Sequence, residues 1–335
     1  MNLQHRTVYI VATLALLTTQ ASCSDTNEAS VAADADTQAE SETTVLATGQ
    51  GYPTSIALSA SHVYWANQVG GTIMRTPLGG GEAEVLASGQ QTPVDVKINE
   101  THVFWANSTS IASVPLAGGE PTLLAEVEET PGLRALDAIA LSDTSLYFSH
   151  AATGSINEVP LQGGDPRVFV DGQEGPGDLA VANGEVYWIN RVVSSTSVGR
   201  SSIARMSATG GSPQTVIGEL KAPWYLSVVQ DDILFTDLGA DPRLPRGQVM
   251  RVAIVGGSAE VLADGQEAPS AVVGDDEGRV YWANLDAGSI CQVESEPAEK
   301  QEIAEGYGDI YALAFDDNYM FWASANQGTI LRKNR

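Results

Sequence analysis

Hydrophobic and polar positions repeat along this chain at intervals of 40 to 47 residues. Each repeat holds two adjacent aromatic residues, with a leucine replacing one of them once. The second members of the seven pairs are separated by 40, 43, 40, 47, 47 and 40 residues. The pairs are Tyr64-Trp65, Phe104-Trp105, Tyr147-Phe148, Tyr187-Trp188, Leu234-Phe235, Tyr281-Trp282 and Phe321-Trp322. A repeat of this length is typical of one four-stranded blade of a β-propeller.

The first complete repeat contains four short runs with strand-forming composition, SIALS, HVYWAN, TIMRTPL and AEVLASG, separated by polar or glycine-rich turns. The seventh repeat ends after its third run. Residues 43–50, TTVLATGQ, match the fourth run of the other repeats but have no earlier runs before them. The pattern therefore predicts an all-β, seven-bladed β-propeller of four-stranded blades over residues 43–335. An N-terminal strand completes the last blade and closes the ring.

The segment before this region, residues 1–23, is typical of an export signal. It has a basic start, an apolar stretch over residues 8–17 and small residues before Cys23. The apolar stretch is well short of the roughly 20 residues that cross a bilayer as a helix. The ending Ala21-Ser22-Cys23 resembles that of bacterial lipoprotein signals, which implies acylation of the Cys23 thiol. Because Gln20 stands where those signals prefer an aliphatic residue, ordinary cleavage near Ala21 is the alternative.

Charge adds to this picture of an exported protein. Residues 24–42 carry six acidic and no basic side chains, which predicts a disordered acidic tether. The whole chain has 42 acidic and 17 basic residues and a formal charge of −25, which argues against nucleic acid or an anionic membrane surface as the main partner. We expect a monomer in the bacterial cell envelope, as an outer-membrane lipoprotein or in the periplasmic or extracellular space. It would touch the membrane only through a lipid anchor.

The aromatic segments YWAN, FWAN, YFSH, YWIN, LFTD, YWAN and FWAS, followed by G-[ST]-I and PL-x-GG, resemble the repeats of YWTD-type propellers. These occur in lipoprotein-receptor ectodomains and in related bacterial proteins. The resemblance implies a propeller that binds proteins or small ligands on one rim, and it implies no reaction. The chain departs from the family in having seven repeats rather than six. It also has asparagine at Asn67, Asn107, Asn190 and Asn284 where the family has aspartate.

One rim of the predicted ring carries the loops between second and third strands and those between successive blades. The second-to-third loops of the fourth and fifth repeats, after Asn190 and Asp237, are the long ones. They hold the candidate ligand-binding arginines Arg191, Arg200, Arg243 and Arg246, and Trp224 lies at a neighbouring strand entrance. Arginines bind carboxylate or phosphate in a bidentate fork, and an aromatic ring can stack on the ligand. The alternative is that the arginines pair with acidic surface residues and Trp224 fills a blade interface.

A second candidate set recurs at the end of each second run: Asn67, Asn107, His150, Asn190, Asp237, Asn284 and Ser324. Such side chains could hold a divalent cation such as calcium, with Asp237, His150 and Asn190 as weak metal candidates. The favoured interpretation is a turn device in which the side chain bonds nearby backbone amides, and no cofactor is predicted. Asp95 and Asp178, near the starts of first strands on the same rim, could join a site or cap a turn.

These observations favour a non-catalytic propeller that binds a protein, a peptide or a small anionic ligand on its loop rim. The sequence contains no serine elbow, phosphate-binding loop or metalloprotease motif. The alternative is a metal-dependent hydrolase or lyase that works in the central channel, with His150, Asp237 and nearby asparagine side chains as its site. Fold alone does not separate a binding protein from an enzyme.

Overall fold

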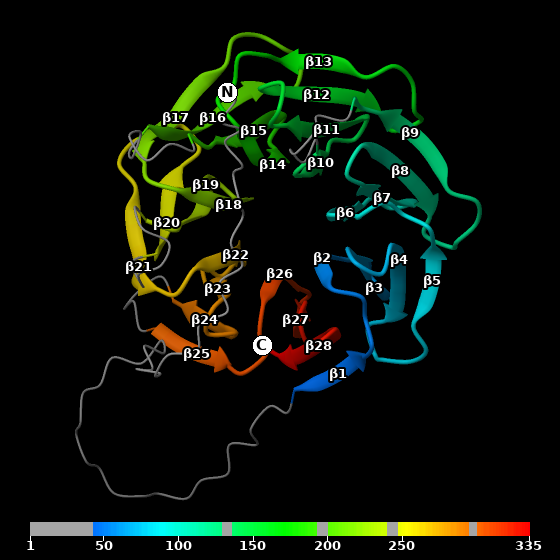
Figure 1. Ribbon diagram of the computed structural model, residues 1–335. Coiled ribbons are helices and arrows are strands. Elements are labelled where there is room, and N and C mark those ends of the chain that lie inside the picture. Colours follow the sequence, from blue (N-terminus) through cyan, green and yellow to red (C-terminus); the bar gives the residue numbers. More distant parts are fainter. Residues whose placement is uncertain (1–42, 129–135, 193–199, 240–246, 295–299) are drawn as a thin grey trace, which may run out of the picture.

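The computed structural model describes residues 43–128, 136–192, 200–239, 247–294 and 300–335. In these residues seven four-stranded antiparallel sheets form a ring, which confirms the predicted seven-bladed β-propeller (Figure 1). Within the described ranges no helix is long and apolar enough to cross a membrane. The predicted signal, Cys23 and the acidic tether lie outside the described residues.

Each blade runs outward from its innermost strand. The first three blades are β2 (Pro53–Leu58), β3 (His62–Asn67), β4 (Thr72–Pro77) and β5 (Glu84–Ala87); β6 (Asp95–Ile98), β7 (His102–Ala106), β8 (Ser110–Pro115) and β9 (Thr122–Glu126); and β10 (Ile139–Leu141), β11 (Ser145–His150), β12 (Ser155–Pro160) and β13 (Arg167–Val170). The next two are β14 (Pro176–Ala182), β15 (Glu185–Asn190), β16 (Ser201–Ser207) and β17 (Gln214–Leu220); and β18 (Pro223–Val229), β19 (Asp232–Asp237), β20 (Gly247–Ala253) and β21 (Glu260–Gln266). The sixth is β22 (Pro269–Gly274), β23 (Val280–Asn284), β24 (Ser289–Val293) and β25 (Lys300–Ala304).

The seventh blade joins the two ends of the folded region. Its inner strands are β26 (Ile310–Phe315), β27 (Tyr319–Ser324) and β28 (Thr329–Asn334), and its outer strand is β1 (Thr44–Ala47). β1 pairs antiparallel with β28, with Val45 opposite Leu331. Figure 1 shows the blue first strand beside the red last one. The N-terminal strand therefore closes the ring as the repeat pattern predicts.

The aromatic pairs form the core between blades. Successive side chains of a strand point to opposite faces of the sheet, so the two members of a pair enter different interfaces. Tyr64 packs with Val96 and Trp105 of the second blade. Trp65 packs on the other side with Phe321 of the seventh blade. Both members are buried, and each blade thus seals the interfaces with both of its neighbours.

A glutamine at the end of one blade's outer strand, or three residues beyond it, anchors the tryptophan of the next blade. The indole nitrogens donate to Gln Oε1 at 2.9 Å for Trp65 and Gln50, 2.7 Å for Trp105 and Gln90, 2.9 Å for Trp188 and Gln173, and 2.9 Å for Trp282 and Gln266. The same oxygen accepts a hydrogen bond from Asn67, Asn107, Asn190 or Asn284. Four blade junctions therefore share one polar link, at the rim where blades connect.

Replacing Gln90 with alanine should lower the free energy of unfolding by about 1–3 kcal/mol, because the buried Trp105 N–H loses its acceptor. Urea unfolding followed by tryptophan fluorescence measures the change. Gln91→Ala, an exposed neighbour of the same type, is the matched control and should change stability by less than about 0.5 kcal/mol. Equal effects of the two substitutions would show that the link adds nothing.

Candidate ligand site in the central channel

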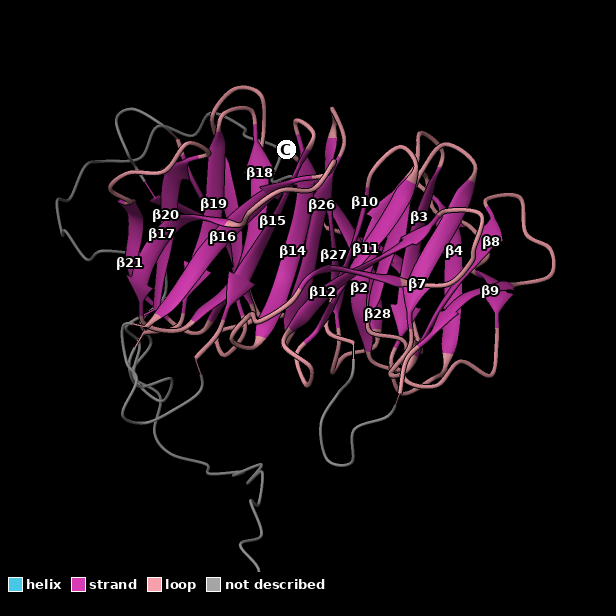
Figure 2. Ribbon diagram, turned by 90° about the horizontal axis from the view of Figure 1, so that it is seen from above, coloured by secondary structure: helices cyan, strands magenta, loops and turns pink. Residues whose placement is uncertain are grey.

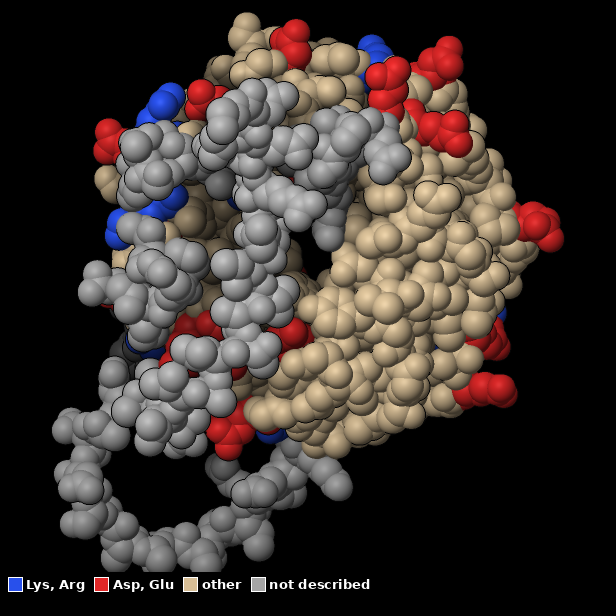
Figure 3. Space-filling view, viewed as in Figure 1, with Lys and Arg blue, Asp and Glu red and all other residues tan. Residues whose placement is uncertain are grey.

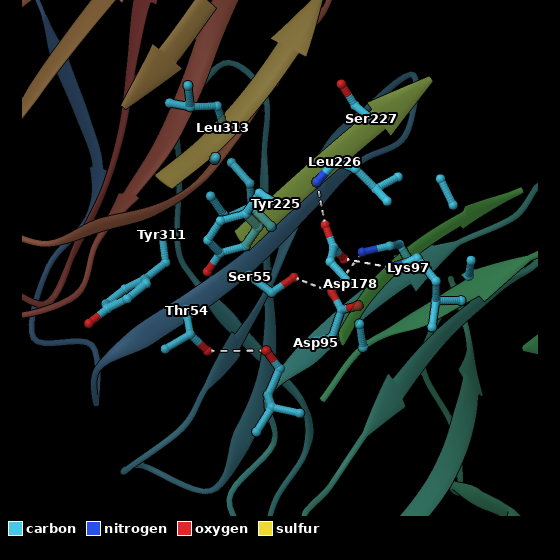
Figure 4. Close-up of a pocket in the computed structure, with 18 of the residues that line it drawn as sticks. Thr54, Ser55, Asp95, Lys97, Asp178, Tyr225, Leu226, Ser227, Tyr311 and Leu313 are labelled. Carbon is cyan, nitrogen blue, oxygen red and sulfur yellow. Dashed lines mark hydrogen bonds and ion pairs between the residues drawn. The ribbon is translucent and has the colours of Figure 1, made fainter. Parts of the chain in front are cut away.

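The seven innermost strands surround a cavity of about 670 Å³. In each blade the lining includes the residue just before the one that pairs with the second aromatic residue. These lining residues are Ser55, Asp95, Ala138, Asp178, Tyr225, Ala271 and Ala312. Alanine in three blades leaves space in the channel, whereas aspartate and tyrosine in the others bring polar groups into it (Figure 4). The lining is therefore chemically asymmetric although the backbone ring is regular.

Asp95, in the second blade, is fixed by three partners. Its Oδ1 accepts hydrogen bonds from Ser55 Oγ at 2.8 Å and from Lys97 Nζ at 2.7 Å. Its Oδ2 accepts the backbone N–H of Ile139 at 3.0 Å. The carboxylate is buried and ties together the first three blades, so its role in the channel is structural as well as electrostatic.

Lys97, on the same strand as Asp95, brings a side-chain ammonium group into the channel lining. Its side chain is 39% exposed and pairs with Asp95. Desolvation in the channel lowers the pKa of Lys97, but the carboxylates of Asp95 and Asp178 raise it more, so the net shift is upward. The amine is protonated at neutral pH and acts as a cation rather than a nucleophile.

Asp178, on β14 of the fourth blade, lies near Lys97 in the channel lining (Figure 4). Its two oxygens accept the backbone N–H groups of Leu179 at 3.0 Å and Leu226 at 2.9 Å. Among the described residues no side chain donates a hydrogen bond to it. Burial raises the pKa of Asp178 to about 6, against the Lys97 charge and the Leu226 N–H, which lower it. The channel thus holds a carboxylate with a strongly perturbed acidity and no cationic hydrogen-bond partner.

The raised pKa predicts a titration that NMR can follow. The carboxyl carbon signal of Asp178 should titrate with a midpoint near 6, above the usual value of 3.8. In the variant Lys97→Met the midpoint should rise further, because the lysine charge lowers the Asp178 pKa. The folded state holds this proton more tightly than the unfolded state, so this group favours folding more as pH falls from about 6 toward 4. A midpoint below 4 in the wild type would contradict the described environment.

The mouth of the channel is built around Trp224, at the start of β18. The Arg191 guanidinium lies over its ring, 4.5 Å from the ring centroid, and donates to Asp137 at 2.7 Å. Gly177 makes this arrangement possible, because a Cβ on that residue would lie 2.6 Å from Arg191 Nε. Trp224 is still 39% exposed. One face of the indole is therefore occupied, and the ring remains accessible at the rim.

Tyrosines form a further part of the channel wall. Tyr52 and Tyr311 lie side by side, with hydroxyl oxygens 3.2 Å apart and ring centroids 6.1 Å apart. Burial raises the pKa of Tyr225 and of Tyr311, so both phenols are neutral over the physiological range. These rings supply flat apolar faces with polar tips to a bound molecule.

Acidic residues lie on the same rim, at the sixth and seventh blades. Burial and the charge of Asp286 raise the pKa of Glu267, and burial and the charge of Asp309 raise the pKa of Asp286. Asp286 is thus close enough to both Glu267 and Asp309 for like-charge repulsion. Figure 3 shows acidic side chains near the middle of the face seen there, over the blades of β22 and β26. The approach to the channel is therefore electronegative on this side.

The loop arginines predicted to bind a ligand are only partly described. Arg191 is paired with Asp137 and stacked on Trp224, so two of the five predicted residues lie together at the channel mouth. Arg200 lies 3.6 Å from Glu174, and both side chains are largely exposed. Arg243 and Arg246 lie outside the described residues. The ligand-binding role of these residues stays a prediction, and both described arginines already have a carboxylate partner.

The recurring residues at the ends of second strands do not line the channel cavity. Asn190 donates to Gln173 Oε1 at 3.2 Å, in the blade-joining link described above, and among the described residues its Oδ1 accepts no backbone N–H. Asp237 does fit the expected turn device, since it accepts the backbone N–H groups of Lys221, Ala222 and Gly239. His150 is buried, which lowers its pKa. Across the described ranges no three His, Cys, Asp or Glu side chains are placed to hold a metal ion together.

Sequence reasoning noted Asp95 and Asp178 but missed Lys97, Tyr225 and Tyr311. The sequence holds a signal for Lys97 and Tyr225, whereas Tyr311 lies two residues before Leu313, at a position that varies from repeat to repeat. When the seven innermost strands are aligned on the residue opposite the second aromatic, the neighbouring positions are mostly alanine or serine. A lysine or tyrosine at such a position departs from the repeat, although packing of the hydrophobic core does not require it. That departure marks a residue of the channel wall.

Comparisons with known proteins give a fold and no family. No protein-family model matches the chain, and no curated protein matches it. Two of the similar solved structures are a streptogramin B lyase, 13% identical with a TM-score of 0.70 over 88% of this chain and 96% of that chain, and a catalytically inactive virginiamycin B lyase from Staphylococcus aureus with quinupristin, 14% identical with a TM-score of 0.70 over 88% and 99%. A third is a nidogen/laminin complex, 19% identical with a TM-score of 0.57 over 76% and 97%.

Identities of this size show the fold alone. The YWTD-type resemblance is a finer assignment and stays a prediction, although the nidogen/laminin structure is among the similar ones. Together with the ring of seven four-stranded sheets and the β1–β28 pairing, the comparisons establish that the chain is a seven-bladed β-propeller.

Proposed function

We propose that this protein is an exported, non-catalytic binding protein whose central channel holds a small polar ligand. The observation that carries the proposal is the cavity of about 670 Å³, in which Lys97, Asp178 and Tyr225 converge from different blades. Sites for small molecules are typically concave, of about 300–1,000 Å³, with a few convergent polar groups on a mainly apolar lining. The export part rests on the signal-like residues 1–23.

The residues and loops at one rim indicate where a ligand enters the channel. Trp224 and the Arg191–Asp137 pair stand at one mouth of the channel, and the inter-blade loops lie on the same rim. Figure 2 shows loops at both ends of the upright strands, so the strands form a rigid wall between two rims. Binding and catalytic residues are commonly carried on loops that a rigid scaffold positions. We therefore place the entrance at the Trp224 rim.

The similar structures support a binding role in general terms. One of them contains quinupristin and another is a complex of nidogen with laminin. In those cases a propeller of this fold is found together with a small molecule or with a protein partner. For this chain the concave, polar channel favours a small molecule over a protein, whose contact surface is usually broad and flatter.

A thermal-shift screen tests the proposal. A library of small polar metabolites is measured against the wild type and against Ala312→Trp, which places an indole in the channel beside Tyr311. We expect compounds that raise the melting temperature of the wild type by several degrees and leave the variant unchanged. Ala253→Trp, at an exposed position of β20, is the matched control and should respond like the wild type. If Ala312→Trp does not fold, Ala180→Phe narrows the channel from the fourth blade.

The proposal fails if the wild type responds to no compound. It also fails if every responding compound acts equally on the wild type and on the folded channel variant, because binding then lies elsewhere on the molecule.

A further inference from the structure

The charges around the channel do not cancel. The lining contains the carboxylates of Asp95, Asp137 and Asp178 and the ammonium group of Lys97. Lys97 pairs with Asp95, and Asp137 pairs with Arg191 at the mouth. Asp178 has only backbone N–H partners among the described residues. One negative charge is therefore left inside a cavity partly screened from water, where an opposite charge is worth more than at the surface.

The approach to the cavity has the same sign. Glu267, Asp286 and Asp309 form an electronegative stretch of the rim at the sixth and seventh blades, where each of the first two has a raised pKa. The whole chain carries a formal charge of −25. Fields of one sign at the mouth of a cleft concentrate ligands of the opposite sign. This observation is independent of the channel residues and favours a cation.

The aromatic residues of the wall favour the same class of ligand. Tyr225, Tyr311 and the partly exposed Trp224 line the same cavity as Asp178. A cation within about 6 Å of an aromatic ring face is attracted by the electrons of the ring. Arg191 over Trp224 shows that this rim already holds one cation in that way.

We infer that the channel is selective for small organic cations, and that a protonated amine of the ligand pairs with the Asp178 carboxylate near the Tyr225 ring. This inference rests on the proposed function and adds the class of ligand. An anion would meet the opposite situation, since Lys97 is already paired with Asp95 and Asp178 would repel it.

Three probes of nearly one shape test the inference: para-fluorobenzylamine, para-fluorobenzyl alcohol and para-fluorobenzoate, titrated into the full chain and followed by fluorine NMR. We expect the amine to bind at least about tenfold more tightly than the alcohol or the benzoate, because one charge-assisted hydrogen bond is worth about that factor. Asp178→Asn should remove this preference. Asp171→Asn makes the same change of net charge at an exposed site on the loop after β13 and should leave the preference unchanged.

The outcomes separate this inference from the proposed function. If the benzoate or the alcohol binds as tightly as the amine, and Ala312→Trp abolishes that binding, the channel is a ligand site but its preference for cations is wrong. If probes bind and Ala312→Trp weakens none of them, the channel site and the inference both fail. If no probe binds, the inference fails, and the thermal-shift screen alone decides the channel site. An amine preference that survives Asp178→Asn would overturn the role given to Asp178.

Discussion

Asp95→Ala should lower the free energy of unfolding by about 3 kcal/mol, the low end of the range for breaking a buried ion pair. The substitution leaves Ser55 Oγ, the Ile139 N–H and the Lys97 ammonium without their shared acceptor. The loss stays below the roughly 5 kcal/mol of a fully buried pair, since Lys97 is 39% exposed and water can solvate it. Urea unfolding at neutral pH measures the difference.

Two further variants divide this effect among its parts. Ser55→Ala removes one hydrogen bond and should cost about 1 kcal/mol. Asp95→Asn retains an acceptor for the Ile139 N–H but not the charge. Its loss of unfolding free energy should lie between those of Ser55→Ala and Asp95→Ala. A loss of less than about 1 kcal/mol for Asp95→Ala would mean that this carboxylate does not tie the first three blades together.

A chain that begins at residue 51 should lose several kcal/mol of stability, on the order of 4 or more, and should self-associate. It lacks β1, whose Leu46 is 6% exposed in the seventh blade. It also lacks Gln50, the acceptor for Trp65 and Asn67. The edge of β28 then has unpaired backbone groups that can pair with another chain.

Thermal melting and light scattering after size exclusion measure these two consequences. A chain that begins at residue 43 retains β1 and is the control, and it should melt like the full chain and remain monodisperse. Equal melting temperatures for the two shortened chains would show that ring closure by the N-terminal strand contributes little to the stability of the fold.

The fold was predictable because the same sequence pattern recurs in each of the seven repeats. The aromatic pair must occupy two interfaces at once, and that requirement recurs in every blade from Tyr64-Trp65 to Phe321-Trp322. Closure was predictable for the same reason, since residues 43–50 match the outer strand of other repeats. The glutamine link could have been found as well, because Gln50, Gln90 and Gln173 each precede their tryptophan by 15 residues.

The site was harder to predict because it consists of departures from the repeat. Lys97 and Tyr311 lie at different positions of their innermost strands, and only the register of β6 and β26 places both in the channel. Partners such as Arg191 and Asp137 are 54 residues apart, in different blades. A repeat pattern identifies which positions are equivalent, whereas the identity of facing side chains across the ring comes from the closed structure.

The central claim, that the channel rather than the loop rim holds the ligand, is tested most directly by a crystal structure of the wild type. The crystal should contain the compound that gives the largest melting shift in the screen. We expect electron density for that compound inside the ring, within hydrogen-bond distance of Asp178 and beside Tyr311. Density on the outer loops, with only water between the innermost strands, would contradict it.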